Sequence, residues 1–158
     1  LCAELFKLRT GINFTLVPFK TTGTLSNALL AGDVDVMFEL TSSSQAVRQT
    51  GKTRSLAISS AQRNETMPEV PTAKELGVPD FEVASWGMIF APARTPDAIV
   101  QRLSQEIQRA FRHPDALKAG QAVGSRIVAG SPAQARQLVA SELTRWGDLI
   151  VKSKIKLG

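Results

Sequence analysis

One short run of residues combines hydroxyl groups, a glycine and a lysine between an expected strand and an expected helix: Phe19, Lys20, Thr21, Thr22, Gly23 and Thr24. A helix N-terminus presents unpaired backbone N–H groups and the positive end of its dipole, and both suit an anion such as a carboxylate. Threonine hydroxyls would add hydrogen-bond donors, and Gly23 would let a ligand approach the backbone. An ordinary helix cap explains the run equally well, because hydroxyl-rich caps are common and the phosphate-binding pattern Gly-x-x-x-x-Gly-Lys is absent.

Glu39 follows the next expected strand, 34–38, and four hydroxyl-bearing residues follow it in an expected loop at 41–44. In open α/β sheets, ligands lie beside the carboxyl ends of the strands, so the two loops should border one crevice. Glu39 would accept an ammonium or hydroxyl proton of a ligand, although a solvated glutamate at a strand end is the simpler alternative. The sequence thus predicts a ligand-binding site made of Phe19, Thr21, Thr22, Gly23, Thr24 and Glu39.

Catalytic and metal-binding residues are scarce in this sequence. His113 is the only histidine and Cys2 the only cysteine, which argues against a catalytic triad, a Cys-His pair and a zinc site. His113 stands before Pro114, where we expect it to complement the carbonyls at the end of a helix. We therefore predict no catalytic residue, no metal and no cofactor.

Composition limits the class of protein. The 158 residues are 43% hydrophobic and 21% charged, which is typical of one globular domain or two small lobes. No apolar run approaches the roughly 20 residues of a membrane-spanning helix. The net charge of +5 would suit an acidic ligand, an anionic surface or a nucleic acid. Tyrosine is absent and the other aromatic residues follow apolar stripes, so we do not expect a nucleic acid partner.

Apolar periodicity predicts strands that alternate with helices, which favours an α/β fold with a mainly parallel sheet. Two regions, 1–84 and 85–158, are expected to meet within 81–89. Strands are predicted at 12–17, 34–38, 54–59 and 126–128. Helices are predicted to end before Gly11, Gly32, Gly51 and Gly77, and to begin after Thr95, at Pro114 and after Ser131.

Several blocks match one protein family in order along the chain. The stretch VPFKTTG…LLAGDVDVMFE, from Val17 to Glu39, resembles the family pattern VPYKGxGPALxDLLGGQVDLMFD. Further matching blocks occupy 51–60, 67–77, 81–92 and 145–147. The sequence thus closely resembles the Bug/TctC family, the extracytoplasmic solute-binding receptors of tripartite tricarboxylate transporters.

The resemblance implies a type II periplasmic-binding-protein-like α/β fold of two lobes, truncated at the N-terminus. Residues 1–84 would be part of the second lobe, and 85–158 would be the C-terminal part of the first lobe, after a hinge at 85–87. The implied protein is a monomeric periplasmic receptor, exported by a signal peptide that this sequence does not contain. It would capture a small organic carboxylate by lobe closure, without catalysis, for the membrane permease subunits of the transporter.

The chain departs from the family pattern within the predicted site. It has Phe19-Lys20-Thr21 for Tyr-Lys-Gly, Thr24-Leu25 for Pro-Ala, and Glu39-Leu40 for Asp-Asn. The ligand therefore stays open among a citrate-like anion, another dicarboxylate, an amino acid and a neutral carbonyl compound. The alternatives to a receptor are a truncated remnant that does not bind ligand, an α/β enzyme and a nucleic-acid-binding module.

Overall fold

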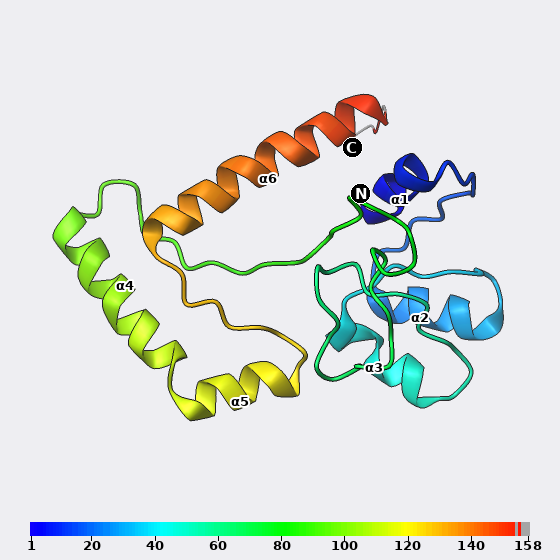
Figure 1. Ribbon diagram of the computed structural model, residues 1–158, viewed down its shortest axis with the longest axis horizontal. Coiled ribbons are helices and arrows are strands. Elements are labelled where there is room, and N and C mark those ends of the chain that lie inside the picture. The colour runs from blue at the N-terminus through cyan, green and yellow to red at the C-terminus, as the bar shows by residue number, and fades with distance from the viewer. Residues whose placement is uncertain (154, 156–158) are drawn as a thin grey trace. The chain divides into compact units, whose positions relative to one another are not determined.

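The computed structural model describes residues 1–153 and 155, and the chain divides into two compact units, Leu1–Ser85 and Trp86–Gly158. The first unit holds α1 (Cys2–Thr10), α2 (Thr22–Ala31) and α3 (Thr41–Gln49) (Figure 1). The second unit holds α4 (Asp97–Phe111), α5 (Pro114–Ala122) and α6 (Pro132–Lys152). Irregular segments connect these helices, and only the connection between α4 and α5 is short, at Arg112 and His113.

Helix ends agree with the local sequence signals. Gly11 ends α1 with φ 71° and Gly32 ends α2 with φ 84°, a left-handed conformation that glycine adopts without strain. Ser131 and Gln134 form the expected capping box at the start of α6. These predictions of helix boundaries are confirmed, because each depends on groups only a few residues apart.

The predicted strands at 12–17, 34–38, 54–59 and 126–128 are wrong for the described part of the chain, which contains no strand ladder. One isolated parallel bridge joins Ile58 to Thr72. Residues with strand propensity form a strand only when a neighbouring strand pairs with their N–H and C=O groups. Apart from this bridge at Ile58, the predicted segments pair with no neighbouring strand within the described residues, so no β-sheet is present there.

Three other local predictions also need correction. Thr41 and Ser44 lie in the first turn of α3 rather than in a loop, and Leu40 is the N-cap residue. The Thr72 and Glu75 capping-box bonds form, yet the backbone that follows makes turns instead of a helix. His113 caps the start of α5, where Nδ1 accepts the N–H of Asp115 at 3.4 Å, instead of complementing the end of the preceding helix.

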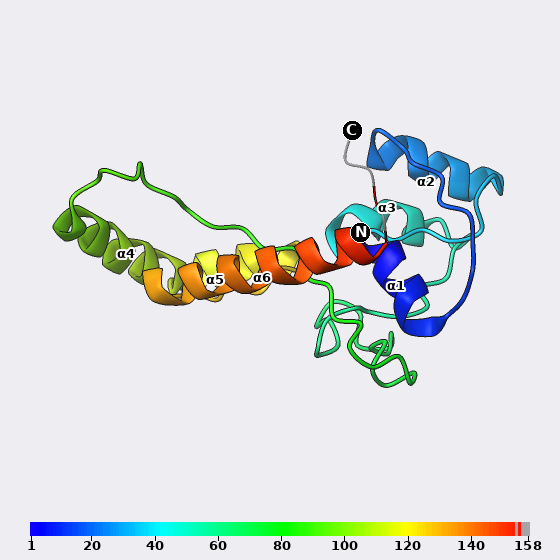
Figure 2. The same cartoon turned by 90° about the horizontal axis from the view of Figure 1, so that it is seen from above.

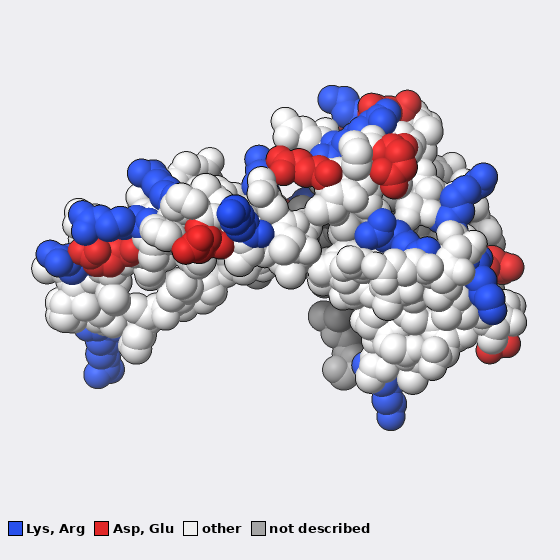
Figure 3. Space-filling model, turned by 90° about the horizontal axis from the view of Figure 1, so that it is seen from below, with Lys and Arg blue, Asp and Glu red and all other residues white. Residues whose placement is uncertain are grey.

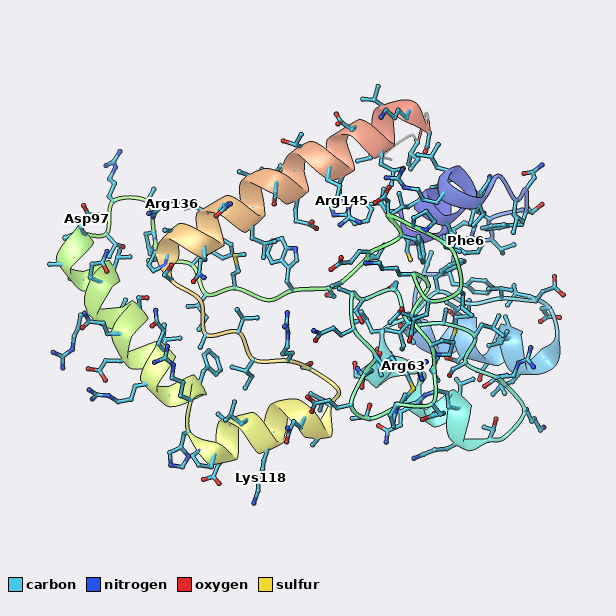
Figure 4. The ribbon with its side chains drawn as sticks, in the orientation of Figure 1. Phe6, Arg63, Asp97, Lys118, Arg136 and Arg145 are labelled. Atoms are coloured by element: carbon cyan, nitrogen blue, oxygen red, sulfur yellow. The ribbon has the colours of Figure 1, made fainter. Side chains whose placement is uncertain are left out.

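A cluster of four phenylalanine rings lies in the first unit around Phe6, which Figure 4 labels, and Phe81 is the buried member of the cluster. Phe6 of α1 lies 5.2 Å from Phe81, 5.6 Å from Phe38 and 6.4 Å from Phe14, measured between ring centroids. Aromatic pairs at these separations contribute stabilisation beyond the area that they bury. The cluster therefore joins α1 to three segments that are not helical, and it holds their backbone in place without a sheet.

The helices of the second unit bury little of their apolar surface. In Figure 1, α4 and α5 meet at a corner and α6 lies apart from them as a long single helix; Figure 2 shows α6 from above, in front of α5. No residue of α4 is buried, and α6 buries only Leu149. Within the described chain, the apolar stripe of α4 therefore has no partner that covers it. None of the described helices has the length and apolar character needed to cross a bilayer.

Candidate functional site

The start of α2 is a well-formed helix cap. Thr21 is the N-cap residue with extended backbone angles, φ −140° and ψ 152°, and its hydroxyl oxygen accepts the N–H of Thr24 at 3.2 Å. The hydroxyl of Thr24 donates back to the carbonyl of Thr21 at 2.9 Å. The first N–H groups of a helix have no partner within it, so the amides of Thr22 and Gly23 are available to a ligand.

Glu39 lies beside this cap. The hydroxyl of Thr22 donates to Oε2 of Glu39 at 2.9 Å, and Oε1 of Glu39 accepts the backbone N–H of Leu40 at 2.8 Å. The structure thus brings together two of the predicted site residues that are 17 positions apart in the sequence. Glu39 connects the N-terminus of α2 to the N-terminus of α3.

These bonds change what the threonine hydroxyls can offer. Each hydroxyl has one proton to donate. The proton of Thr22 is used by Glu39, and that of Thr24 is used by the carbonyl of Thr21. The hydroxyl oxygens of Thr21 and Thr24 also lie 3.1 Å apart. Of the three expected hydroxyl donors, only Thr21 keeps a proton that no carbonyl or carboxylate takes, and the amides of Thr22 and Gly23 add to it. Thr22 can still accept a proton from a ligand through its oxygen.

The predicted site residues lie at or near the surface. Thr21, Gly23 and Thr24 are exposed, and Phe19, Thr22 and Glu39 are half-buried. A Cβ atom added at Gly23 would lie 3.9 Å from the hydroxyl oxygen of Thr21, which is an ordinary contact. The fold of the described chain therefore does not itself require glycine at this position.

Two open hollows of about 480 Å³ lie away from the predicted residues, one in each unit. The hollow in the first unit is lined by Arg63 and Glu75 among others, and the hollow in the second unit by Arg109, Arg112 and His113 among others. Neither is lined by the predicted site residues. The cap of α2 thus lies outside both of these hollows.

Arg63, labelled in Figure 4, forms an ion pair with Glu75, in which Nη2 lies 3.0 Å from Oε1. Nε of Arg63 lies 3.1 Å and 3.0 Å from the two carboxylate oxygens, and its Nη1 donates to the carbonyl of Pro68 at 2.9 Å. The hydrogen bonds from Arg63, followed by the one from the backbone of Thr72, lower the pKa of Glu75 from 4.5 to about 2. We interpret this pair as a latch for the loop 60–77.

Sequence reasoning found Thr72 and Glu75 through their capping-box spacing but missed Arg63. Its partner lies 12 positions further along the chain, beyond the reach of a helical spacing rule. The only available signal was an arginine in a polar loop that also contains a glutamate.

We looked for a second site in the distribution of charged side chains and in possible metal ligands. On the face drawn in Figure 3, basic and acidic side chains are interspersed instead of gathered into one basic patch. Among residues 1–153 and 155, no group of His, Cys, Asp and Glu side chains is arranged to hold a metal ion. The N-terminus of α2 combines amide donors with the hydrogen bond from Thr22 to Glu39.

Sequence comparison identifies the family of this chain. The model of the TctC family, described as "Tripartite tricarboxylate transporter family receptor", matches residues 1–155. The chain belongs to this family, so the predicted membership is confirmed. Its members are non-catalytic solute-binding receptors.

Two curated relatives show how similar the sequences are and how much of each chain is matched. The UPF0065 protein in the tcbD-tcbE intergenic region of Pseudomonas sp. strain P51 is 34% identical over 98% of this chain and 46% of its own length. Protein BugT of Bordetella pertussis is 34% identical over 99% of this chain and 48% of its own length. The chain thus spans about half the length of these relatives.

Solved structures show the same backbone over a similar share. The R. palustris protein Rpa4515 with adipate has a TM-score of 0.83 and 30% identity, covering 98% of this chain and 52% of its own. The periplasmic binding protein BugD has a TM-score of 0.77 and 26% identity, covering 98% and 52%. MatC from Rhodopseudomonas palustris with bound malate has a TM-score of 0.75 and 32% identity, covering 94% and 52%. The described chain therefore matches about half of a periplasmic binding protein fold.

Proposed function

We propose that this chain serves in a periplasmic solute-binding receptor that captures a small organic carboxylate by closure of two lobes, without catalysis. The observation that carries the proposal is the cap of α2. It leaves the amides of Thr22 and Gly23 available beside the hydroxyl of Thr21, within a chain that belongs to a receptor family. Oriented N–H groups at a helix N-terminus hold a carboxylate by hydrogen bonds and by the helix dipole.

Each predicted residue has a specific part in this binding mode. The amides of Thr22 and Gly23 and the hydroxyl of Thr21 donate to one ligand carboxylate. Glu39 takes the proton of Thr22 and so holds the first turn of α2 in position. Its carboxylate oxygens retain lone pairs that accept a hydroxyl proton from the ligand. Phe19, half-buried at the start of the run, provides an apolar contact.

The ligand class follows from this balance of donors and acceptors. Structures of relatives contain adipate and malate, both of them dicarboxylates. In the present chain, Glu39 would repel a second carboxylate placed next to it but would accept a hydroxyl proton. A dicarboxylate with a hydroxyl group near one carboxylate, as in malate, fits the α2 cap better than an unsubstituted one such as adipate.

The relatives support the remaining parts of the proposal. BugD is a periplasmic binding protein, so we place this receptor in the periplasm as well. The family description links it to a tripartite tricarboxylate transporter, whose membrane permease subunits would receive the ligand from a monomeric receptor. Residues 1–84 would contribute to the second lobe and 85–158 to the first, joined by a hinge at 85–87.

Calorimetric titration of the full-length protein tests the proposal. Malate, adipate, citrate and a neutral dialdehyde of similar length would be compared at equal ionic strength. We expect binding of malate to be at least about tenfold tighter than binding of adipate, which corresponds to about one hydrogen bond made to a charged group. The neutral compound should not bind measurably.

Two outcomes would contradict the proposal. If no carboxylate binds, the alternative of a remnant that does not bind ligand is favoured. If a salt-sensitive shift of DNA or RNA is seen instead, the nucleic-acid alternative is favoured. A preference for adipate over malate would retain the receptor but reject the role of Glu39 as a proton acceptor.

A further inference from the structure

The corner at which α4 meets α5 (Figure 1) holds the hollow of the second unit, with a volume of about 480 Å³. Its lining consists of Gln105, Gln108, Arg109, Arg112, His113 and Pro114. Two of these six residues are arginines, and none is acidic. A concave surface that carries positive charge and no carboxylate favours an anionic partner.

Backbone hydrogen bonds fix the corner itself. The N–H of His113 donates to the carbonyl of Ala110 at 3.1 Å, and the carbonyl of His113 accepts the N–H of Leu117, also at 3.1 Å. Pro114, with its restricted φ angle, is the first residue of α5. The side chains that line the hollow therefore start from a defined backbone, which lowers the entropy lost when a partner binds.

His113 is held as a hydrogen-bond donor toward a partner. Its Nδ1 accepts the backbone N–H of Asp115 at 3.4 Å. A neutral imidazole that accepts at Nδ1 carries its proton on Nε2, so Nε2 can donate. The carboxylate of Asp115 also approaches the ring at Nδ1, with Oδ2 at 3.4 Å, and thus leaves Nε2 to other acceptors.

The two arginines keep positive charge in excess. Nη1 of Arg109 lies 3.4 Å from Oε2 of Glu106, but Glu106 also pairs with Nε of Arg102, at 3.0 Å. One carboxylate is therefore shared by two guanidinium groups, and the side chain of Arg109 is 83% exposed. Arg112 is exposed and takes part in none of the ion pairs of the described chain.

We propose that the α4–α5 hollow is a docking site for an acidic peptide segment of a partner protein, whose carboxylates bind Arg109 and Arg112. Residues three apart at the end of a helix lie side by side, so their two guanidinium groups match two acidic side chains on neighbouring turns. A guanidinium also binds a carboxylate in a planar, bidentate manner.

The exposure of the hollow favours a peptide over a small anion. An ion pair formed in full contact with water contributes little. A peptide segment covers the hollow, excludes water from the pairs and engages both arginines together. A membrane surface is flat and needs a broad basic face, whereas acidic and basic side chains are interspersed on the face drawn in Figure 3. This inference concerns a protein partner and stands apart from ligand capture at α2.

Binding of fluorescein-labelled hexaglutamate to the full-length protein, followed by fluorescence anisotropy at low ionic strength, tests the proposal. Malate is present in excess, so that the α2 cap does not contribute. We expect hexaglutamate to bind and hexaglutamine not to bind. Arg109→Ala and Arg112→Ala should each weaken binding about fivefold, because each removes one ion pair. Arg112→Lys, which keeps the charge without the planar fork, should recover part of the loss.

Arg102→Ala is the matched control. Arg102 carries the same charge on the same helix and is 77% exposed, but it does not line the hollow. Its replacement should change the affinity by less than about twofold, because a more distant exposed charge is screened. Helical circular dichroism of each variant must match that of the unsubstituted protein, which separates a lost contact from unfolding.

Four results would overturn the proposal. Hexaglutamate that fails to bind would show that the hollow takes no acidic segment. Equal losses in Arg102→Ala and Arg112→Ala would show attraction by overall charge alone. Displacement of the peptide by citrate at an equal concentration of carboxylate groups would indicate a small-anion site. Tighter binding to phosphatidylserine vesicles than to the peptide, lost in Arg112→Ala, would indicate a membrane contact instead.

Discussion

Thr22 donates its hydroxyl proton to Glu39 across 2.9 Å, and this bond joins the first turn of α2 to the residue before the N-cap of α3. Helices α2 and α3 are in contact in the first unit. The bond lies in a partly buried position, where a lost hydrogen bond is only incompletely replaced by water. It therefore supports both the local fold and the geometry of the candidate binding surface.

We predict that Thr22→Val lowers the free energy of unfolding by about 1 kcal/mol, since valine has the same shape and lacks the donor. Urea denaturation measures this change. Thr24→Val is the matched control, because its hydroxyl is exposed and bonds only within the cap. It should cost less than half as much. Equal costs would show that the bond to Glu39 contributes nothing specific.

Replacement of Gly23 separates binding from folding. An added Cβ has room in the free protein, so Gly23→Ala should leave the stability unchanged or raise it by up to about 1 kcal/mol. The same methyl group would obstruct a carboxylate on the amides of Thr22 and Gly23, and we expect affinity to fall at least about tenfold. Calorimetric titration with malate measures the effect.

Gly147, in the middle of α6, provides the control for this prediction. A Cβ there meets nothing within 4 Å. Gly147→Ala should therefore stabilise the protein by about 1 kcal/mol and leave malate affinity unchanged. If Gly23→Ala also leaves the affinity unchanged, the N-terminus of α2 is not the carboxylate site.

The latch between Arg63 and Glu75 predicts how stability responds to acid. The pKa of Glu75 is about 2 in the folded chain, against an ordinary value of 4.5 for a glutamate without these partners. The folded state therefore favours the ionised carboxylate. Its contribution to stability is complete above about pH 4.5 and is lost progressively as the pH falls toward 2. Thermal unfolding between pH 7 and pH 2 should show this decline.

Substitution of Glu75 tests the assignment of this decline. Glu75→Gln should lower the melting temperature at pH 7 and flatten the acid dependence, because the group that titrates is gone. Glu69→Gln, an exposed carboxylate in the same loop, should preserve the slope of the unsubstituted protein. A slope that survives in Glu75→Gln would assign the acid sensitivity to other carboxylates.

Two phenylalanines with opposite burial test the core of the first unit. Phe81 is 7% exposed and lies 5.2 Å from the ring of Phe6, so Phe81→Ala should cost about 3–5 kcal/mol. Phe90 is 73% exposed, and Phe90→Ala should change stability by less than about 0.5 kcal/mol. Chemical denaturation of both variants checks the contrast. A large loss for Phe90→Ala would show that its ring packs against protein outside the described contacts.

Local sequence signals were sufficient for the ends of the helices. Gly11 and Gly32 adopt left-handed backbone angles, and Ser131 with Gln134 forms its capping box, as their spacing predicts. Each of these features depends on hydrogen bonds between groups no more than about four residues apart. The sequence blocks that resemble the family, in the same order along the chain, also predicted the family correctly. The family model matches residues 1–155 and confirms that prediction.

Features that need two distant segments depended on the tertiary structure. Strand propensity at 12–17 and 34–38 produced no strands in the described chain, because a strand exists only when another segment pairs with it. Likewise, only the folded chain shows that the proton of Thr22 goes to Glu39 and that Arg63 pairs with Glu75. By itself the sequence determined which groups could bond locally and which family the chain resembles. Tertiary packing decided which donors and acceptors meet, because the direction of a side-chain hydrogen bond is set by neighbours that are remote along the chain.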